Sequence, residues 1–420
     1  VPYWLDKPFD YKIPTELSGL VLPGVRVLVP FSTNNRRSEG IVLGLSEHSS
    51  FEKLKSIDSV LDNENLLDED QIKLAIWMHN RFFCTVYEAV KAMLPTGLWF
   101  KWGKRKANDK IIKMVELVIP AEDALALAEQ KSRVARAQAE ILRTLCAVGQ
   151  VSLNELKEFS GASANSIRAL EKSGCLVITE EPVFRKPESL QGDISRGLPE
   201  LTGEQHTAYS ELSSRIKKGE MTAGLLFGVT GSGKTAVYIR LIDEMLQSGK
   251  SSILLIPEIA LTPQMLQTFI SFFGDVVAVM HSKLSVGERY DEWKRIRQGI
   301  AKIIIGTRSA VFSPAQNLGL IIIDEEQEET YKSENSPRYH ARDVANFRCA
   351  QKGAALLLGS ATPDIESRYF AETGRYAFFE LPSRYNMVPL PDVKIVDMKK
   401  ELREGNGGSI SSVLMRELEN

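Results

Sequence analysis

The chain has 420 residues, of which 43% are hydrophobic and 25% charged, and its formal net charge is −2. This composition is typical of a globular protein of about three domains and excludes a polycation that binds nucleic acid over its whole surface. No stretch resembles a membrane span or a signal peptide, so we expect a cytoplasmic protein without a membrane partner. The four scattered cysteines, Cys84, Cys146, Cys175 and Cys349, form no C-x-x-C pair, which predicts neither a zinc site nor a disulfide framework within these residues.

The first 108 residues are expected to form an N-terminal domain. Residues 1–60 alternate short β-like segments with turns, and the predicted strands are Phe9–Ile13, Val25–Pro30 and Gly40–Leu45. Apolar residues at helical spacing over Leu67–Leu94 predict a helix that ends at Pro95. Trp99–Lys106 interleaves aromatic and basic residues. That pattern is typical of a nucleic-acid contact or of a linker with buried tryptophans, and both interpretations stay open.

Residues 109–182 have the outline of a winged-helix domain, followed by a polar linker over 183–199. The predicted helices and strand are Ala137–Val148, Leu153–Ser160, Ser163–Ser173 and Leu176–Thr179. Ser152 and Ser163 are expected to be N-caps. Such modules often bind duplex DNA, although many only mediate protein contacts. The third helix carries little positive charge beyond Arg168 and Lys172, so direct reading of a DNA major groove is weakly supported.

Residues 200–391 alternate strands and helices, which predicts a doubly wound parallel sheet. The predicted strands are Gly224–Gly228, Ser252–Ile256, Val276–Met280, Lys302–Ile305, Leu320–Ile323 and Ala355–Gly359. Residues 392–420 contain a new helix over Ser409–Glu419, and we expect them to begin a connection to a further lobe. The chain as a whole is therefore expected to be an α/β multidomain protein.

The stretch Leu225–Thr235, LLFGVTGSGKT, fits the phosphate-binding pattern G-x-x-x-x-G-K-[ST]. Glycines let backbone N–H groups converge on an anion, and the helix expected over Ala236–Leu246 directs its positive end to the same place. Lys234 would reach the β- and γ-phosphates, and the Thr235 hydroxyl would bind Mg²⁺. The expected nucleotide-binding residues are Gly228, Val229, Thr230, Gly231, Ser232, Gly233, Lys234 and Thr235.

A second motif, LGLIIIDEE over Leu318–Glu326, is an apolar run of the kind seen in buried parallel strands, followed by carboxylates. Asp324 is placed to hold the magnesium ion, and Glu325 is the candidate to orient or deprotonate the attacking water. Asp324, Glu325 and Lys234 are therefore the expected catalytic residues. The two motifs together predict a nucleotide triphosphatase.

The order of motifs in the last domain resembles that of the first lobe, which is RecA-like, of superfamily 2 helicases. The amino-acid sequences of these motifs resemble those of the PriA family of replication-restart helicases. The ordered set is LTGEQ (Leu201–Gln205), PEIALTPQ (Pro257–Gln264), HS (His281–Ser282), GTRSAVFSP (Gly306–Pro314), DEEQ (Asp324–Gln327) and GSATP (Gly359–Pro363). The segment Tyr331–Ala345 resembles the aromatic-rich loop of that family. PFDY (Pro8–Tyr11) and RVLVPF (Arg26–Phe31) resemble its N-terminal DNA-binding domain.

The resemblance implies roles for further residues. Gln205 would read the adenine of ATP, and Gln327, Ser360 and Thr362 would relay the nucleotide state to DNA. Residues expected to contact the single-stranded backbone are Thr262, Gln264, Thr307, Arg308 and Ser309. In the aromatic loop, Arg338 and Tyr339 would contact and stack on bases. Phe9 and Asp10, with Lys55 beside them, would hold a 3′-terminal nucleotide.

Two residues depart from the family pattern: Gln327 replaces the usual His of the DEEH motif, and Ser32 replaces the usual Gly after VPF. We also expect the chain to be the N-terminal part of a longer protein. Its zinc-binding cysteines, its second helicase lobe and the arginines that complete the ATP site would lie beyond Asn420. The 420 residues alone are therefore expected to hydrolyse ATP poorly.

The resemblance implies an ATP- and Mg²⁺-dependent 3′–5′ DNA helicase of the bacterial cytoplasm and nucleoid. It would recognise stalled or repaired replication forks and single strands with a 3′ end, and would initiate primosome assembly with single-strand-binding protein and other primosome proteins. The alternative is an ATP-switched DNA-structure-binding module without helicase activity. A duplex-translocating relative of the RecG type is disfavoured by the aromatic loop.

Overall fold

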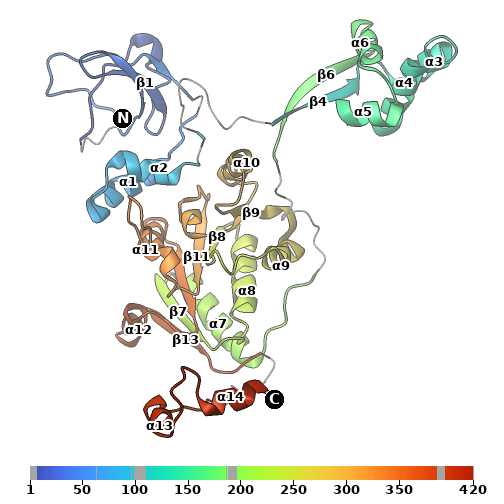
Figure 1. Cartoon of the computed structure of the whole chain (residues 1–420). Coiled ribbons are helices and arrows are strands. Elements are labelled where there is room, and N and C mark those ends of the chain that lie inside the picture. Colours follow the sequence, from blue (N-terminus) through green and yellow to red (C-terminus); the bar gives the residue numbers. More distant parts are fainter. Residues whose placement is uncertain are drawn as a thin grey trace.

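The N-terminal module is built on a three-stranded antiparallel sheet (Figure 1), and the computed structural model describes residues 7–62, 64–95, 97–98, 110–185, 187, 196–385 and 393–419. After η1 (Thr15–Leu17), β1 (Arg26–Phe31) pairs with β2 (Arg36–Ile41) on one side and β3 (Ser59–Val60) on the other. Alternate residues of β1 enter the small core. The tryptophan-rich segment Trp99–Lys106 lies outside the described residues.

Two strand predictions in this module are wrong. Phe9–Ile13 forms no strand and makes a single bridge, between Lys12 and Ser56. The strand predicted over Gly40–Leu45 is β2, which begins earlier, at Arg36, and already ends at Ile41. Its first residues are exposed and charged, and an edge strand tolerates such residues because its outer face and free edge meet water.

The expected single helix over Leu67–Leu94 is two helices, α1 (Glu69–Phe82) and α2 (Val86–Met93). Phe83 adopts a left-handed conformation with φ 52°, which ends the first helix. Thr85 and Glu88 then form a capping box that starts the second. The apolar periodicity continues across the break, because each of the two helices buries a largely apolar face.

These two helices pack against the large C-terminal lobe and share its hydrophobic core. The ring of Trp77 stacks on Phe347 of α11 (Ala341–Lys352), with centroids 4.5 Å apart. Lys352 at the end of α11 forms an ion pair with Asp70 of α1. Figure 1 shows α1 and α2 between the N-terminal sheet and α11. The N-terminal module therefore reaches the lobe through packed apolar side chains.

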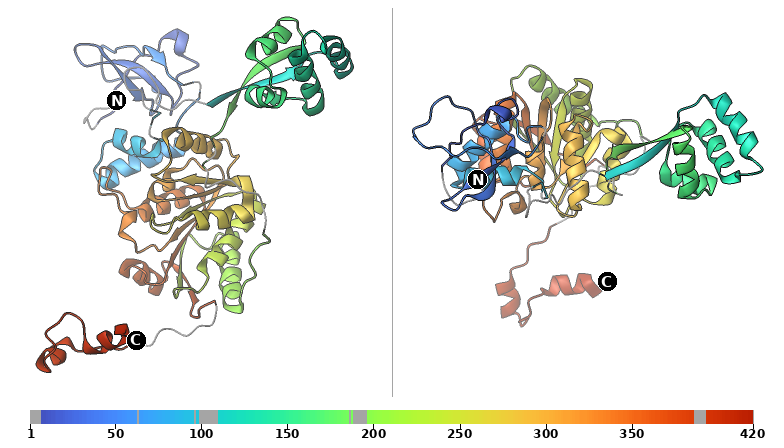
Figure 2. Two further views of the ribbon diagram at one scale, coloured as in Figure 1. Left: turned by 45° about the vertical axis from the view of Figure 1, so that its right-hand side comes forward. Right: turned by 90° about the horizontal axis from the view of Figure 1, so that it is seen from above.

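A second module, residues 110–185, combines a small antiparallel sheet of order β5-β4-β6 with four helices. Ser152 and Ser163 cap helices as expected, accepting hydrogen bonds from the backbone N–H groups of Glu155 and Ser166. β4 and α3 were not predicted. The elements are β4 (Lys110–Leu117), α3 (Ala121–Lys131), α4 (Arg136–Val148), β5 (Val151–Ser152), α5 (Leu153–Ser160), α6 (Ala164–Lys172) and β6 (Leu176–Val183). Figure 2 shows this module standing away from the lobe in both views.

The C-terminal lobe contains a seven-stranded, entirely parallel sheet, which confirms the predicted α/β class and doubly wound sheet. The strand order is β13-β7-β12-β11-β8-β10-β9, and the edge strand β13 was not predicted. The strands are β7 (Ala223–Gly228), β8 (Ser251–Leu255), β9 (Val277–Met280), β10 (Ile303–Gly306), β11 (Leu318–Asp324), β12 (Ala355–Ser360) and β13 (Ala377–Leu381).

Helices cover both faces of this sheet, each over its own hydrophobic core. α7 (Gly203–Lys217), α8 (Lys234–Gln247) and α9 (Pro263–Phe273) lie on one face. α10 (Val286–Arg297), α11 and α12 (Ile365–Glu372) lie on the other. The remaining elements are η3 (Gly274–Val276), η4 (Arg308–Phe312), η5 (Glu329–Tyr331), α13 (Met398–Arg403) and α14 (Ser412–Glu419). Within the described ranges, no helix is long and apolar enough to cross a membrane.

Candidate nucleotide and DNA sites

The phosphate loop joins the end of β7 to the start of α8. Gly231 and Gly233 both have φ of 80°, a conformation that favours glycine, and Lys234 is the first residue of α8. Lys234 is 8% exposed, and its ammonium donates a hydrogen bond of 3.0 Å to the carbonyl of Gly228. A Cβ added at Gly228 would lie 2.6 Å from Ser232 Oγ, so the loop closes on itself only with glycine there.

This loop fits a polyphosphate. The Oγ of Ser232 is shielded from solvent and has no hydrogen-bond partner among the described residues. The open N-terminus of α8 and the Lys234 ammonium add positive potential at the same place. Thr235 lies in the first turn of α8, where its hydroxyl is available to a metal ion. The residues present therefore match the phosphate and magnesium chemistry expected of this motif.

Asp324 is the last residue of β11 and Glu325 follows it, at the same edge of the sheet as the phosphate loop. The phenol of Tyr238, fully buried on α8, donates a 2.9 Å hydrogen bond to Asp324 Oδ1. Burial raises the pKa of Asp324, and this hydrogen bond opposes the rise. The Oε1 of Glu325 lies 3.7 Å from Lys234 Nζ. The structure thus brings together all three expected catalytic side chains, from two motifs about ninety residues apart.

Tyr238 was not singled out from the sequence, although a signal was present. It lies four residues after Lys234, so both side chains emerge from the same face of α8. Glu326 was also missed. It is 2% exposed and accepts hydrogen bonds from Arg342, Ser367 and the backbone of Asp364. Glu326 thereby fastens the end of β11 to α11 and α12.

A chain of hydrogen bonds runs from Glu325 to the GSATP segment. Gln327 Nε2 donates to Glu325 Oε2 at 3.0 Å, and Ser360 Oγ donates to Gln327 Oε1 at 2.6 Å. The Ser360 hydroxyl in turn accepts a bond of 2.9 Å from the N–H of Thr362. The three residues expected to couple the sites therefore form one chain of hydrogen bonds, which reaches Glu325 through Gln327.

Gln205 lies against the phosphate loop. Its side chain is 1% exposed, and both ends of the amide bind protein. Nε2 donates to the carbonyl of Ser232 at 2.8 Å, and Oε1 accepts from the N–H of Thr202 at 3.0 Å. In this conformation the amide is engaged with the loop, so the predicted two-bond contact with adenine requires the side chain to rotate.

The residues expected on the DNA backbone lie at the ends of two neighbouring strands, β8 and β10. Thr262 caps α9 and Gln264 is exposed in its first turn. Thr307 is the N-cap residue of η4. Ser309 is the second residue of η4 and is exposed. Arg308 is engaged instead: it donates to the carbonyl of Thr330 at 3.0 Å and lies over the ring of Tyr339.

The aromatic loop requires a correction. Tyr339 was expected to stack on bases, but its side chain is 5% exposed and packs edge-on against Phe312, with centroids 4.9 Å apart. Tyr331 is also buried and donates to the carbonyl of Asp324 at 2.7 Å. Both rings are held by the apolar core of the lobe. Only Arg338 of the expected pair is exposed.

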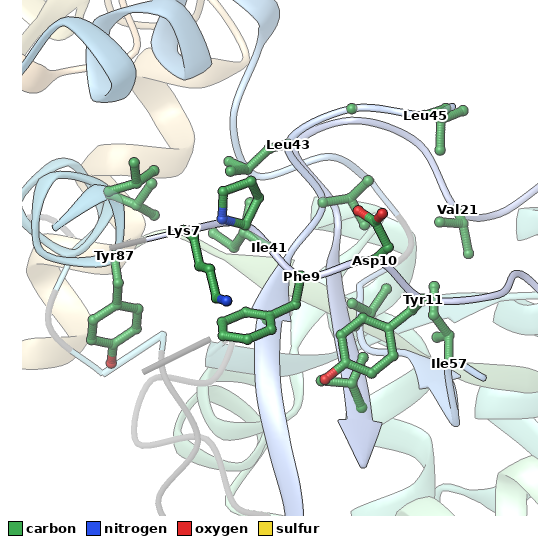
Figure 3. A pocket seen from close by; sticks show the side chains of 18 of the residues that line it. Lys7, Phe9, Asp10, Tyr11, Val21, Ile41, Leu43, Leu45, Ile57 and Tyr87 are labelled. Atoms are coloured by element: carbon green, nitrogen blue, oxygen red, sulfur yellow. The ribbon is translucent and has the colours of Figure 1, made fainter. Parts of the chain in front are cut away.

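The N-terminal module contains a pocket of about 450 Å³ lined by Phe9 and Asp10 (Figure 3). Phe9 packs edge-on against Phe31, and Asp10 accepts a 2.6 Å hydrogen bond from the Ser49 hydroxyl. Lys55 is not among the lining residues. It donates to the carbonyl of Ser32 at 2.5 Å, and Ser32 has φ of 63°, which explains why glycine suits that position. The pocket's apolar walls suit a base or sugar.

Two protein families match parts of this sequence. Residues 1–95 match the family described as PriA 3′DNA-binding domain, and residues 205–369 match the DEAD/DEAH box helicases. The chain is 35% identical to the replication restart protein PriA of Bacillus subtilis, covering 99% of this chain and 59% of the relative. It is 32% identical to that of Chlamydia pneumoniae, covering 94% and 52%. A RecG structure bound to a three-way DNA junction aligns with a TM-score of 0.34 at 22% identity, covering 46% of this chain and 26% of RecG.

Proposed function

Because the chain belongs to the replication restart protein PriA family, we propose that it supplies the DNA-binding and ATP-binding parts of an ATP-dependent 3′–5′ DNA helicase. The protein would recognise stalled or repaired replication forks and initiate primosome assembly. The chain spans a little over half the length of the relatives named above. The activity of the whole protein is therefore a proposal for this chain.

The observation that carries the proposal is the chain of hydrogen bonds from the proposed nucleotide site to the GSATP segment after β12. Glu325 faces Lys234 on one side and Gln327 on the other, and Gln327 is held by Ser360 of the neighbouring strand β12. A movement of Glu325 on nucleotide binding or hydrolysis would be transmitted to the segment after β12. A link whose arrangement changes with the bound nucleotide distinguishes a motor from a protein that only binds nucleotide.

The roles of the residues follow from their positions. The loop from Gly228 to Thr235 would bind the triphosphate through its N–H groups and the Lys234 ammonium. Thr235 and Asp324 would hold Mg²⁺, and the bound ion would neutralise negative charge on the phosphates. Glu325 would accept a proton from the attacking water. We propose slow hydrolysis by the 420 residues alone, because an arginine finger contributes about 10³–10⁵ in rate and would come from a second lobe.

The DNA side rests on the N-terminal pocket and on Thr262, Gln264, Thr307 and Ser309. Residues 1–108 would bind a 3′ end, 109–182 would act as a winged-helix domain, and 200–391 as the first helicase lobe, with 183–199 and 392–420 as connections. Zinc, single-strand-binding protein, other primosome proteins and a location in the bacterial cytoplasm near the nucleoid are supported by resemblance alone.

An ATP-switched DNA-binding module without helicase activity is the second candidate, favoured by the slow hydrolysis expected of these 420 residues. The deciding experiment is DNA-stimulated ATP hydrolysis by a protein that continues through the second lobe, compared with its Lys234→Ala variant. Stimulated turnover that is lost in the variant supports the helicase. Nucleotide-dependent changes in fork affinity without turnover favour the switch. Turnover and nucleotide-dependent fork affinity that both persist unchanged in Lys234→Ala would contradict both.

A further inference from the structure

The chain that leaves β13 crosses directly over the phosphate loop. The N–H of Val229 donates to the carbonyl of Leu381 at 3.3 Å, and the N–H of Tyr385 donates to the carbonyl of Gly231 at 2.8 Å. Backbone hydrogen bonds between the two stretches of chain thus continue past the ends of β13 and β7, although the strand pairing itself ends at Leu381 and Gly228. Segment 382–385 is held beside the loop by a backbone hydrogen bond at each end, one at Leu381 just before it and one at Tyr385. These bonds do not depend on the side chains at 384 and 385.

A second anchor joins the same segment to the start of α7. Ser383 donates to the carboxylate of Glu204 twice, from Oγ at 2.9 Å and from its N–H at 3.3 Å. Glu204 immediately precedes Gln205, the residue expected to read the base. Segment 382–385 is therefore fixed on the Gln205 side of the loop, between β13 and α7.

Tyr385 leaves its ring in water at this position, with 63% of the residue exposed. Its Cβ lies 3.8 Å from where a Cβ on Gly233 would be, and that same point collides with the Gln205 amide. Tyr385 and Gln205 thus flank Gly233 together. An exposed aromatic ring fixed beside a phosphate loop is a ready platform for a nucleotide base.

Arg384 provides an independent observation. Its Nε is shielded from solvent and has no hydrogen-bond partner among the residues that the structure describes. Its Cγ lies 4.0 Å from where a Cβ on Gly231 would be, so the side chain starts at the tip of the phosphate loop. A shielded N–H without an acceptor costs stability, and an anionic ligand oxygen would remove that cost.

We propose that segment 382–385 completes the nucleotide site, with Tyr385 stacking on the base and Arg384 donating to a nucleotide oxygen. This inference rests on the proposed function, since it requires that the loop bind ATP. Stacking does not distinguish one base from another, because every base has a π-face. Tyr385 therefore supplies affinity, and selection of adenine is left to Gln205.

The test compares the affinities of Mg-ATP and of Mg-tripolyphosphate, which has no base, measured by calorimetry on the 420-residue chain. Tyr385→Ala should weaken ATP binding about tenfold and leave tripolyphosphate binding unchanged, because about 1–3 kcal/mol per stacked base is lost. Tyr385→Phe should bind ATP like the wild type. Arg384→Ala should weaken ATP binding about fivefold. Tyr369→Ala, which removes a similarly exposed tyrosine (59%) on α12, is the matched control and should change neither ligand.

The inference is overturned if Tyr385→Ala binds ATP as tightly as the wild type, or if it loses both ligands equally, since the latter indicates a distorted loop. These outcomes leave the proposed function intact provided that wild-type binding depends on Lys234. If wild-type protein binds neither ligand, or if Lys234→Ala retains both, the proposed ATP site itself is wrong and this inference falls with it.

Discussion

The hydroxyl of Ser360 donates a 2.6 Å hydrogen bond to the side-chain oxygen of Gln327, while the amide nitrogen of Gln327 donates to Glu325. One amide therefore connects the proposed general base to the neighbouring strand. Glutamine can do this because its side chain is both donor and acceptor. A neutral histidine has the same capability through its two ring nitrogens, so the departure from the DEEH pattern preserves the chemistry of the link.

We predict that Gln327→Ala uncouples nucleotide from DNA. Coupling between two sites is typically about 5–150-fold in affinity. The ratio of single-stranded DNA dissociation constants without and with a non-hydrolysable ATP analogue should fall in this variant from about tenfold to below about threefold. Gln327→His should retain the wild-type ratio, and Glu329→Ala, an exposed neighbour, is the control. An unchanged ratio in Gln327→Ala, measured by fluorescence anisotropy, would remove Gln327 from the coupling path.

A second prediction concerns the N-terminal pocket. Asp10→Ala should weaken binding of a fork with a free 3′-hydroxyl about fivefold or more, because a charged acceptor contributes about 1.5–3 kcal/mol to a hydrogen bond. A fork with a 3′-phosphate should be affected less than twofold by the same change, about 0.4 kcal/mol, since the carboxylate repels that group. Glu16→Ala, an exposed carboxylate on η1, is the control. Equal losses for both forks would mean that Asp10 is structural.

The burial of Tyr339 changes what its substitution should do. Tyr339→Ala removes a packed ring and should lower the free energy of unfolding by about 3 kcal/mol, following large-to-small core substitutions. Burial raises the pKa of Tyr339 to about 12, which fits a phenol inside the lobe. Arg338→Ala should leave thermal stability unchanged and reduce the salt dependence of single-strand binding by about one phosphate contact. Loss of single-strand binding in Tyr339→Leu with normal stability, while Tyr339→Phe still binds, would restore the stacking role.

Asp324→Asn should stabilise the nucleotide-free protein at neutral pH. Burial raises the pKa of Asp324, so the folded protein disfavours the ionised carboxylate relative to the unfolded chain. Above that raised pKa the charge reduces the free energy of unfolding, and the reduction disappears as pH falls through it. Asparagine keeps an acceptor for Tyr238 without the charge. In thermal melts we expect a higher Tm at pH 7, a smaller difference in acid, and no added stabilisation by Mg-ATP.

A lower Tm for Asp324→Asn at pH 7 would show that the carboxylate's contacts outweigh its burial. Asp243→Asn on α8 serves as the control, because Asp243 lies more than two helical turns beyond Lys234 and its carboxylate accepts a hydrogen bond from Gln247.

The sequence by itself determined the elements whose information is local. The phosphate loop needs glycines at fixed offsets, the strand cores need unbroken aliphatic runs, and the caps at Ser152 and Ser163 need a hydroxyl at one position. Each depends on residues within about ten positions, so spacing alone predicts it. The boundary between α1 and α2 was missed because apolar periodicity continues across Phe83, where only a left-handed residue and a capping box mark the break.

Only the tertiary structure decided which distant residues meet. Tyr238 reaches Asp324 across 86 positions, and Ser383 reaches Glu204 across 179. Strand order places β12 between β7 and β11, and so sets Ser360 against Gln327. Tyr339 is buried by Phe312 of a different element, although its own segment reads as an exposed aromatic loop. Such contacts depend on packing free energy summed over the whole lobe, which no short window of sequence contains.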